Sequence, residues 1–167
     1  MVLIIIIILT TACAEGSGKI DKSEYLRIHI RANSNLESDQ IVKYAVKDAV
    51  VAYLTPIVSE CPTKEDAVKK IGEVKPTIKF LCDSVLKDNG KNYYSAIEVR
   101  NEEFPTRIYE GLTLESGYYD ALIVELGEAK GDNWWCVVYP PFCFTDVKEV
   151  KYRSKIIEII RKWRNNE

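Results

Sequence analysis

The chain has 167 residues, of which 47% are hydrophobic and 29% charged, a composition typical of one folded domain and not of a disordered chain. Its formal net charge at pH 7 is −2, so it lacks the overall positive field that nucleic-acid-binding proteins usually carry. We therefore expect a single domain with no polynucleotide partner.

The N-terminus has the pattern of a secretion signal. The unbroken apolar run over residues 2–9 is too short to cross a bilayer, which takes about 20 residues, and the small residues Ala12, Cys13 and Ala14 follow it. This pattern predicts a signal segment over residues 1–14 and a linker over residues 15–24. The alternatives are a buried strand and a lipid anchor on Cys13.

Cleavage after Ala14 would leave an even number of cysteines, as is common in proteins that form disulfides in an oxidising compartment. These cysteines are Cys61, Cys82, Cys136 and Cys143, and four cysteines allow three different pairings.

The domain itself opens with a predicted strand. Residues 25–32, YLRIHIRA, alternate between apolar side chains on one face and Arg27, His29 and Arg31 on the other. Such alternation predicts a half-buried strand with its charged face toward solvent.

Two long helices are predicted next. Ser34 stands three residues before Glu37, a capping box that predicts a helix start, and apolar residues between positions 42 and 57 supply the buried face of that helix. A second helix is predicted from a cap at Thr63 to a stop at Asp-Asn-Gly, residues 88–90.

The second half of the chain predicts strands, because apolar residues recur with a period of two from Tyr93 onward. Turn residues at 115–117 and 129–132 separate these strands, the last of which covers residues 133–139. Since helices and strands come in separate runs, the predicted fold class is α+β. We expect one domain over residues 25–167, with an N-terminal strand, two long helices, an antiparallel sheet and a C-terminal helix.

The predicted C-terminal helix covers residues 150–164 and is amphipathic. Tyr152, Ile156, Ile160 and Trp163 lie on one stripe, and lysines and arginines dominate the rest. We expect it to dock on the domain with a solvated basic face, and contact with a membrane surface is the alternative.

Motifs of catalysis and of metal binding are absent from the sequence. A triad mechanism would have to use His29, the single histidine, whose arginine neighbours favour the neutral imidazole. The cysteine spacings fit neither a zinc site nor a C-x-x-C redox motif, and there is no Gly-rich phosphate loop. We expect no metal and no cofactor, and these absences favour a binding or signalling protein over an enzyme.

The segment over residues 133–144, NWWCVVYPPFCF, is the most unusual in the chain. Its strand must leave the sheet at Pro140 and Pro141, which cannot donate ladder hydrogen bonds. A turn there can bring Cys143 back toward Cys136, and a disulfide between them would stiffen an aromatic loop suited to recognition. Alternatively the aromatic residues are core filler, with one of the adjacent tryptophans facing in and the other out.

Two blocks of sequence resemble the stage II sporulation protein R family of endospore-forming Firmicutes. They are GYYDALIVELGEAKGDNWWCVVYPPFCF, residues 117–144, and LRIHIRANSNLESDQIVKYAVKDAV, residues 26–50. The resemblance implies a secreted signalling protein, not an enzyme, that is exported into the space between the forespore and mother-cell membranes. There it would activate a membrane-embedded aspartic protease of the mother cell, which processes a sigma-factor precursor. The alternative function is a secreted or lipid-anchored envelope hydrolase.

The matched blocks supply the candidate partner-binding residues. From the second block these are Trp134, Trp135, Tyr139, Pro140, Pro141, Phe142 and Phe144, with a Cys136–Cys143 disulfide holding the loop. From the first block they are His29, Asn33, Asp39 and Gln40. Which of them contacts the protease is a hypothesis of ours, and the pairing of Cys61 and Cys82 stays open.

Overall fold

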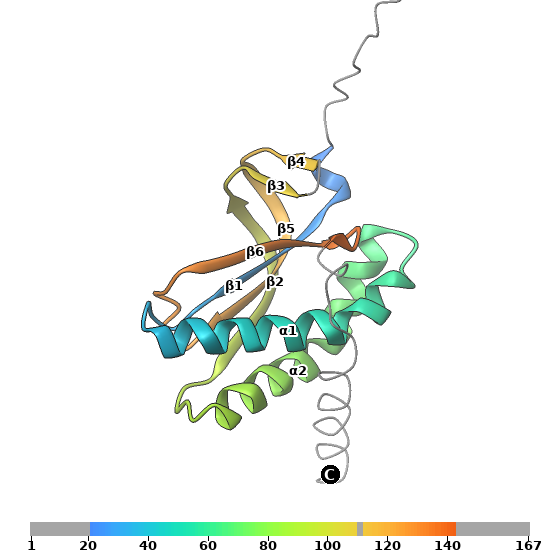
Figure 1. Cartoon of the computed structure of the whole chain (residues 1–167). Coiled ribbons are helices and arrows are strands. Elements are labelled where there is room, and N and C mark those ends of the chain that lie inside the picture. The colour runs from blue at the N-terminus through green and yellow to red at the C-terminus, as the bar shows by residue number, and fades with distance from the viewer. Residues whose placement is uncertain (1–20, 110–111, 143–167) are drawn as a thin grey trace, which may run out of the picture.

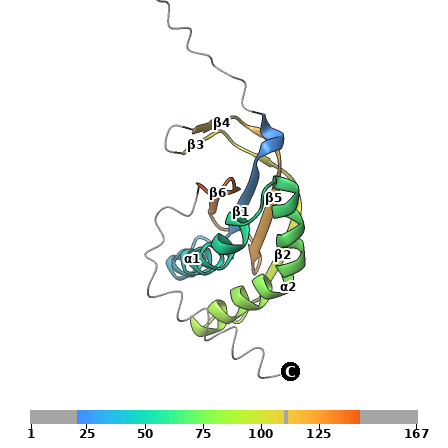
Figure 2. The ribbon, with the colours of Figure 1, turned by 90° about the vertical axis from the view of Figure 1, so that its right-hand side faces the viewer.

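A four-stranded sheet and two long helices form the body of the protein in the computed structural model, which describes residues 21–109 and 112–142. The elements are, in chain order, the 3-10 helix η1 (Lys22–Glu24), β1 (Leu26–Arg31), α1 (Glu37–Ser59), α2 (Lys64–Asp88), β2 (Ser95–Phe104), β3 (Arg107–Tyr109), β4 (Leu112–Leu114), β5 (Gly117–Leu126) and β6 (Asn133–Tyr139). The helices α1 and α2 pack against each other and against the sheet, and the β3–β4 hairpin lies beyond the far end of the sheet, near η1 (Figures 1 and 2). The α+β class predicted from the sequence is confirmed.

The sheet is mixed, and the prediction of an antiparallel sheet was wrong. Its strand order is β2-β5-β1-β6, and β1 pairs in parallel with β5 but antiparallel with β6. A parallel pair needs a long crossover connection, which α1, α2 and β2 provide here. The period-two pattern cannot reveal this arrangement, because alternation is the same whichever way a neighbouring strand runs.

Both faces of β1 are buried, so the predicted half-buried strand is also corrected. Leu26, Ile28 and Ile30 enter the large core beneath the helices. Arg27 and His29 point to the opposite face and are only 0% and 1% exposed. A second cluster covers them there, formed by Phe104, Leu114, Tyr119, Ala121, Ile123 and Val137. Leu114 and its partner strand β3 thus act as a partial second layer.

The two helices differ in how they begin. Thr63 caps α2 as predicted, because its side chain accepts a hydrogen bond from the backbone N–H of Asp66. The capping box predicted for α1 is wrong: Leu36 occupies the cap position, and no side chain caps the helix. Ser34 instead accepts from the N–H of Leu36 and donates to Asp39.

Several predicted segments lie outside the described residues. These are the signal segment 1–14, most of the linker 15–24, Cys143, Phe144 and the C-terminal helix 150–164. The end of the predicted linker is ordered as η1, where Lys22 Nζ donates to the carbonyl oxygen of Ser116 at 2.6 Å. Within residues 21–109 and 112–142, neither helix combines the length and apolar character that crossing a bilayer requires.

Candidate functional site

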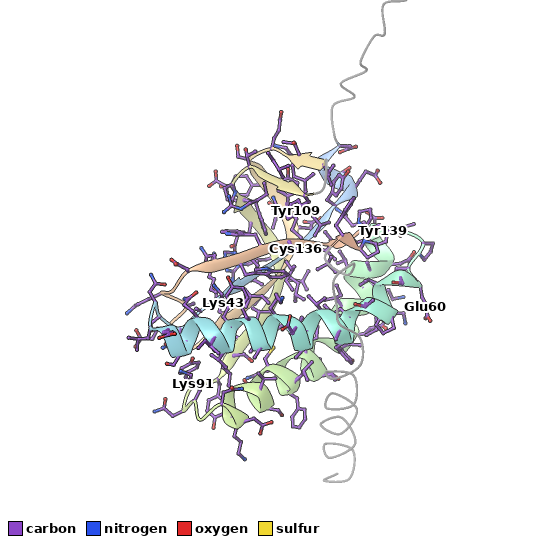
Figure 3. The ribbon with its side chains drawn as sticks, viewed as in Figure 1. Lys43, Glu60, Lys91, Tyr109, Cys136 and Tyr139 are labelled. Carbon is purple, nitrogen blue, oxygen red and sulfur yellow. The ribbon has the colours of Figure 1, made fainter. Side chains whose placement is uncertain are left out.

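The unusual segment starts as the strand β6 and leaves the sheet where the sequence predicted. The Tyr139–Pro140 peptide bond is cis, and the N–H of Phe142 donates to the carbonyl of Pro140 at 2.9 Å. Tyr139 is held in place because its hydroxyl donates to the carbonyl of Pro62, at 2.9 Å, in the connection between the helices. Figure 3 shows Tyr139 at the end of β6. Phe142, 38% exposed, therefore projects from an anchored corner.

The adjacent tryptophans lie on opposite faces of the sheet, and both are half-buried. Trp134 packs against the core beneath the helices, and Lys47 Nζ lies 5.8 Å from its ring centroid. Trp135 belongs to the opposite face, where it stacks on His29 with ring centroids 3.6 Å apart. The expectation that one tryptophan faces outward is therefore wrong, because a packed layer meets each side of β6.

His29 is the centre of a polar network on that second face. Its Nδ1 lies 2.8 Å from Glu102 Oε1, and the same carboxylate accepts a hydrogen bond from Arg31 at 2.5 Å. Arg100 extends the network to Glu102 and Glu125. The other ring nitrogen of His29, Nε2, is buried and makes no hydrogen bond of good geometry within the part of the chain that the structure describes.

Burial lowers the pKa of His29, and the hydrogen bond to Glu102 opposes this shift only in part. The neutral imidazole predicted from the sequence is thus favoured, but mainly by burial, with Arg31 as a smaller cause. Its ring touches Trp135, and this stack brings together one candidate residue from each sequence block.

The pH dependence of stability tests this environment. The unfolded chain takes up the His29 proton as the pH falls below about 6.5, whereas the folded chain resists doing so. The free energy of unfolding should therefore fall as the pH decreases from 6.5 to 5, and this decline should be smaller in His29→Gln. His29 is the single histidine, so urea denaturation at several pH values isolates its contribution. Parallel declines in the two proteins would contradict the assigned shift.

The remaining candidates of the first block form a separate cluster around Asp39, which is 3% exposed. Its carboxylate accepts four hydrogen bonds of 2.6 to 2.8 Å, from Asn33 Nδ2, Ser34 Oγ, Lys91 Nζ and the hydroxyl of Tyr93. Burial alone would favour the neutral acid, but these donors outweigh it and hold the pKa of Asp39 well below its usual range. Asp39 thus joins the start of α1 to the α2–β2 connection.

Asn33 and Gln40 extend this cluster to the β5–β6 loop. Asn33 Oδ1 accepts from the N–H of Glu128 at 2.9 Å, beside Gly127, whose φ of 58° suits glycine. Gln40 accepts from Lys43 Nζ at 2.7 Å, and the same ammonium donates to the carbonyl of Asp132 at 3.0 Å. These contacts hold the start of α1 against the β5–β6 loop.

Sequence reasoning missed Arg27, although it lies two residues from His29 on the same face. Its guanidinium carbon is 4.1 Å from the ring centroid of Phe104 and 4.8 Å from that of Tyr119. The alternating pattern placed Arg27 in solvent because nothing in it indicates a second covering layer. A basic residue between apolar neighbours was the one available signal.

Two of the cysteines are free thiols, Cys61 and Cys82. Burial raises the pKa of the Cys82 thiol above its usual range, and Cys61 Sγ lies 3.3 Å from the carbonyl of Ile57. Neither therefore supports the pairing that an even number of cysteines suggested. The Cys136–Cys143 bridge stays a prediction, since Cys143 lies outside the described residues. No group of three or more metal-ligating side chains occurs in the part of the chain that the structure describes.

These features define a small α+β domain with one helix-covered sheet face and one face of aromatic and charged side chains. The chain belongs to the stage II sporulation protein R family, because the model of that family matches residues 22–149. It is 31% identical over 137 residues to the stage II sporulation protein R of Bacillus subtilis (strain 168), an alignment that covers 82% of this chain and 61% of the relative. The chain thus spans less than two thirds of that relative's length. No solved structure matches it. The resemblance identified from the two sequence blocks is confirmed.

Proposed function

We propose that this protein is a secreted signal of sporulation that activates a membrane-embedded aspartic protease. It would act in the space between the forespore and mother-cell membranes, and the protease would then process a mother-cell sigma-factor precursor. Family membership carries the proposal, and the apolar run over residues 2–9 supports export. The protein would act as a ligand and not as an enzyme.

The corner at the end of β6 is the part of the second block best suited to contact the protease. Its backbone is restricted by Pro140 and Pro141, and the hydroxyl of Tyr139 anchors its base. A restrained aromatic side chain such as Phe142 loses little conformational entropy on binding. A Cys136–Cys143 disulfide would stiffen the corner further. The clusters around Asp39 and His29 would stabilise the domain that presents this corner, with the Asp39 cluster at the other end of α1, and the basic segment 150–164 would contact the membrane surface.

Reconstitution in a bacterium that does not sporulate tests the proposed function. The host would express the protease and the sigma-factor precursor, together with this protein either with or without residues 1–14. We expect precursor cleavage only with the exported form. Absence of cleavage, with the protein shown to be folded and exported, would contradict the proposal and favour the envelope-hydrolase alternative.

Phe142→Ala is the sharpest variant for the same assay. We expect cleavage to fall at least tenfold, because a central aromatic anchor often supplies about 2 kcal/mol of binding free energy. Thermal stability should change little, since the ring is 38% exposed. Tyr94→Ala is the matched control, as Tyr94 is 75% exposed and precedes β2. Full cleavage with Phe142→Ala would contradict the assignment of the Phe142 ring as the anchor of the corner.

A further inference from the structure

Arg27 is a buried cation that has no matching anion among the described residues. Its side chain is 0% exposed, and its Nη2 donates one hydrogen bond, to the hydroxyl of Tyr109 at 2.8 Å. Its Nε and Nη1 are buried and have no hydrogen-bond partner, and none of the ion pairs among the described residues involves it. Unpaired buried charge is normally costly to a folded protein, so this arrangement needs an explanation.

Aromatic rings surround the guanidinium but leave its donors unsatisfied. Its central carbon lies 4.1, 4.8 and 5.8 Å from the ring centroids of Phe104, Tyr119 and Tyr109. Ring faces attract a cation, yet they offer no acceptor in the plane of its N–H groups. Burial lowers the pKa of Arg27, and Arg107 acts in the same direction. The rings thus offset part of the cost of burial but leave the Nε and Nη1 donors without an acceptor.

A second unpartnered atom lies on the same face. His29 Nε2, together with Nε and Nη1 of Arg27, makes up the whole set of buried side-chain nitrogen and oxygen atoms that lack a partner in the described residues. Both residues contact the ring of Phe104, which is edge-on to His29 at 5.9 Å. Because Nδ1 of the neutral ring donates to Glu102, Nε2 is an acceptor, and the unused donors at this place among the described residues are Nε and Nη1 of Arg27.

The β3–β4 hairpin covers this place without joining the four-stranded sheet. Its strands have three residues each and pair only with each other, and an isolated two-stranded hairpin is marginally stable. It is held over the sheet by the Tyr109 hydroxyl and by packing of Leu112 and Leu114, while Ile108 is 73% exposed. Figure 3 shows Tyr109 on this hairpin. Displacing Tyr109 would free the bonded Nη2 of Arg27 without breaking the ladder of the four-stranded sheet.

We propose that Arg27 and its aromatic surroundings form a carboxylate-binding site, which an Asp or Glu side chain of the partner protein enters as it displaces Tyr109. The proposal rests on the proposed function for the partner's identity. A carboxylate can accept two parallel hydrogen bonds from the N–H groups of a guanidinium. In Arg27, the N–H groups of Nε and Nη1 are the unused donors. Arg107, whose guanidinium carbon lies 5.8 Å from the ring centroid of Trp135, adds positive charge at the same end of the face.

The test of the site itself does not need the protease. Acetate serves as the probe carboxylate, at about 200 mM, against chloride at the same ionic strength. We expect acetate to raise the melting temperature of the wild-type protein by about 2 °C, because a ligand that binds only the folded state stabilises it. Arg27→Met should show no such rise, and no rise in the wild type, or an equal rise in both, would overturn the site.

Arg27→Met also separates a binding role from a structural one. Methionine fills similar apolar volume without the unpaired charge, so the variant should melt at the same or a higher temperature than the wild type. In the reconstituted assay it should nevertheless reduce precursor cleavage at least tenfold. A lower melting temperature of Arg27→Met, together with no acetate response in the wild type, would instead show that Arg27 is a structural residue, and overturn the proposal.

Two further outcomes keep the hypotheses distinct. If Arg27→Met does not fold, Tyr109→Phe is the substitute variant. It lacks the hydroxyl that competes for Arg27, so acetate should raise its melting temperature more than that of the wild type. An equal rise in the two proteins would overturn the site. If the wild type responds to acetate but causes no cleavage, the proposed function fails and the carboxylate site stands. If acetate stabilises the wild type but Arg27→Met still supports normal precursor cleavage, the site binds a free carboxylate. That result would overturn the role of the partner protein.

Discussion

Asp39→Ala is expected to lower the free energy of unfolding by about 3 kcal/mol, because removing one partner of a buried ion pair leaves the other charge uncompensated. The ammonium of Lys91, 2.7 Å from Asp39 Oδ1, is only 14% exposed. Tyr93 and Asn33 would lose their acceptor as well. Urea denaturation at pH 7 measures the effect.

Asp48→Ala is the control for this variant, since Asp48 pairs with Lys47 on the same helix but is 34% exposed. We expect it to change the free energy of unfolding by less than about 1 kcal/mol. The contribution of Asp39 also depends on pH: its folded pKa is depressed, so the stabilisation is complete above about pH 4 and is lost as the pH falls further. An Asp39→Ala protein as stable as the Asp48→Ala protein would contradict the central role of this carboxylate.

Phe104→Ala is expected to cost about 4 kcal/mol, the range found when a fully buried aromatic ring is truncated. Phe104 is 0% exposed, and its ring lies 4.9 Å from Trp135, 5.9 Å from Tyr119 and 4.1 Å from the Arg27 guanidinium. The variant would remove the ring that contacts both Trp135 and Arg27 on the second face.

Ile108→Ala is the matched control for Phe104→Ala, because it truncates an apolar residue of the neighbouring hairpin that is 73% exposed. Its free energy of unfolding should stay within about 0.5 kcal/mol of the wild-type value. Thermal and urea denaturation of the pair compare the two effects. Equal losses would mean that the second face is packed loosely and that the Phe104 ring does not organise it.

Much of the helix-covered core could be predicted from the sequence, because it is encoded in local periodicity. Alternation placed Leu26, Ile28 and Ile30 on one face, and all of them are buried. The second face could not be predicted in the same way. Tyr109, which binds Arg27, is 82 residues further along the chain, and no local pattern indicates that such distant residues form a covering layer.

The site around Asp39 illustrates a similar limit. Ser34 has two acidic residues within reach, Glu37 and Asp39, and spacing alone favours Glu37 as the partner of a capping box. The structure selects Asp39, because the loop before β2 brings Lys91 and Tyr93 to the same carboxylate. Both donors lie more than fifty residues away in sequence. The residue types could be recognised from the sequence, but their partners could not.

The central position of β1 in the sheet determines the order in which the chain can fold. It is the first strand to be synthesised, yet its parallel neighbour begins to pair with it 94 residues later, as the Arg31 to Glu125 contact shows. Contacts of such long range slow folding, because a large loop must close before they form. A nascent chain that ends before β5 has its helices but no sheet on which to pack them. The four-stranded sheet therefore cannot be completed until β5 and β6 are available to pair with β1.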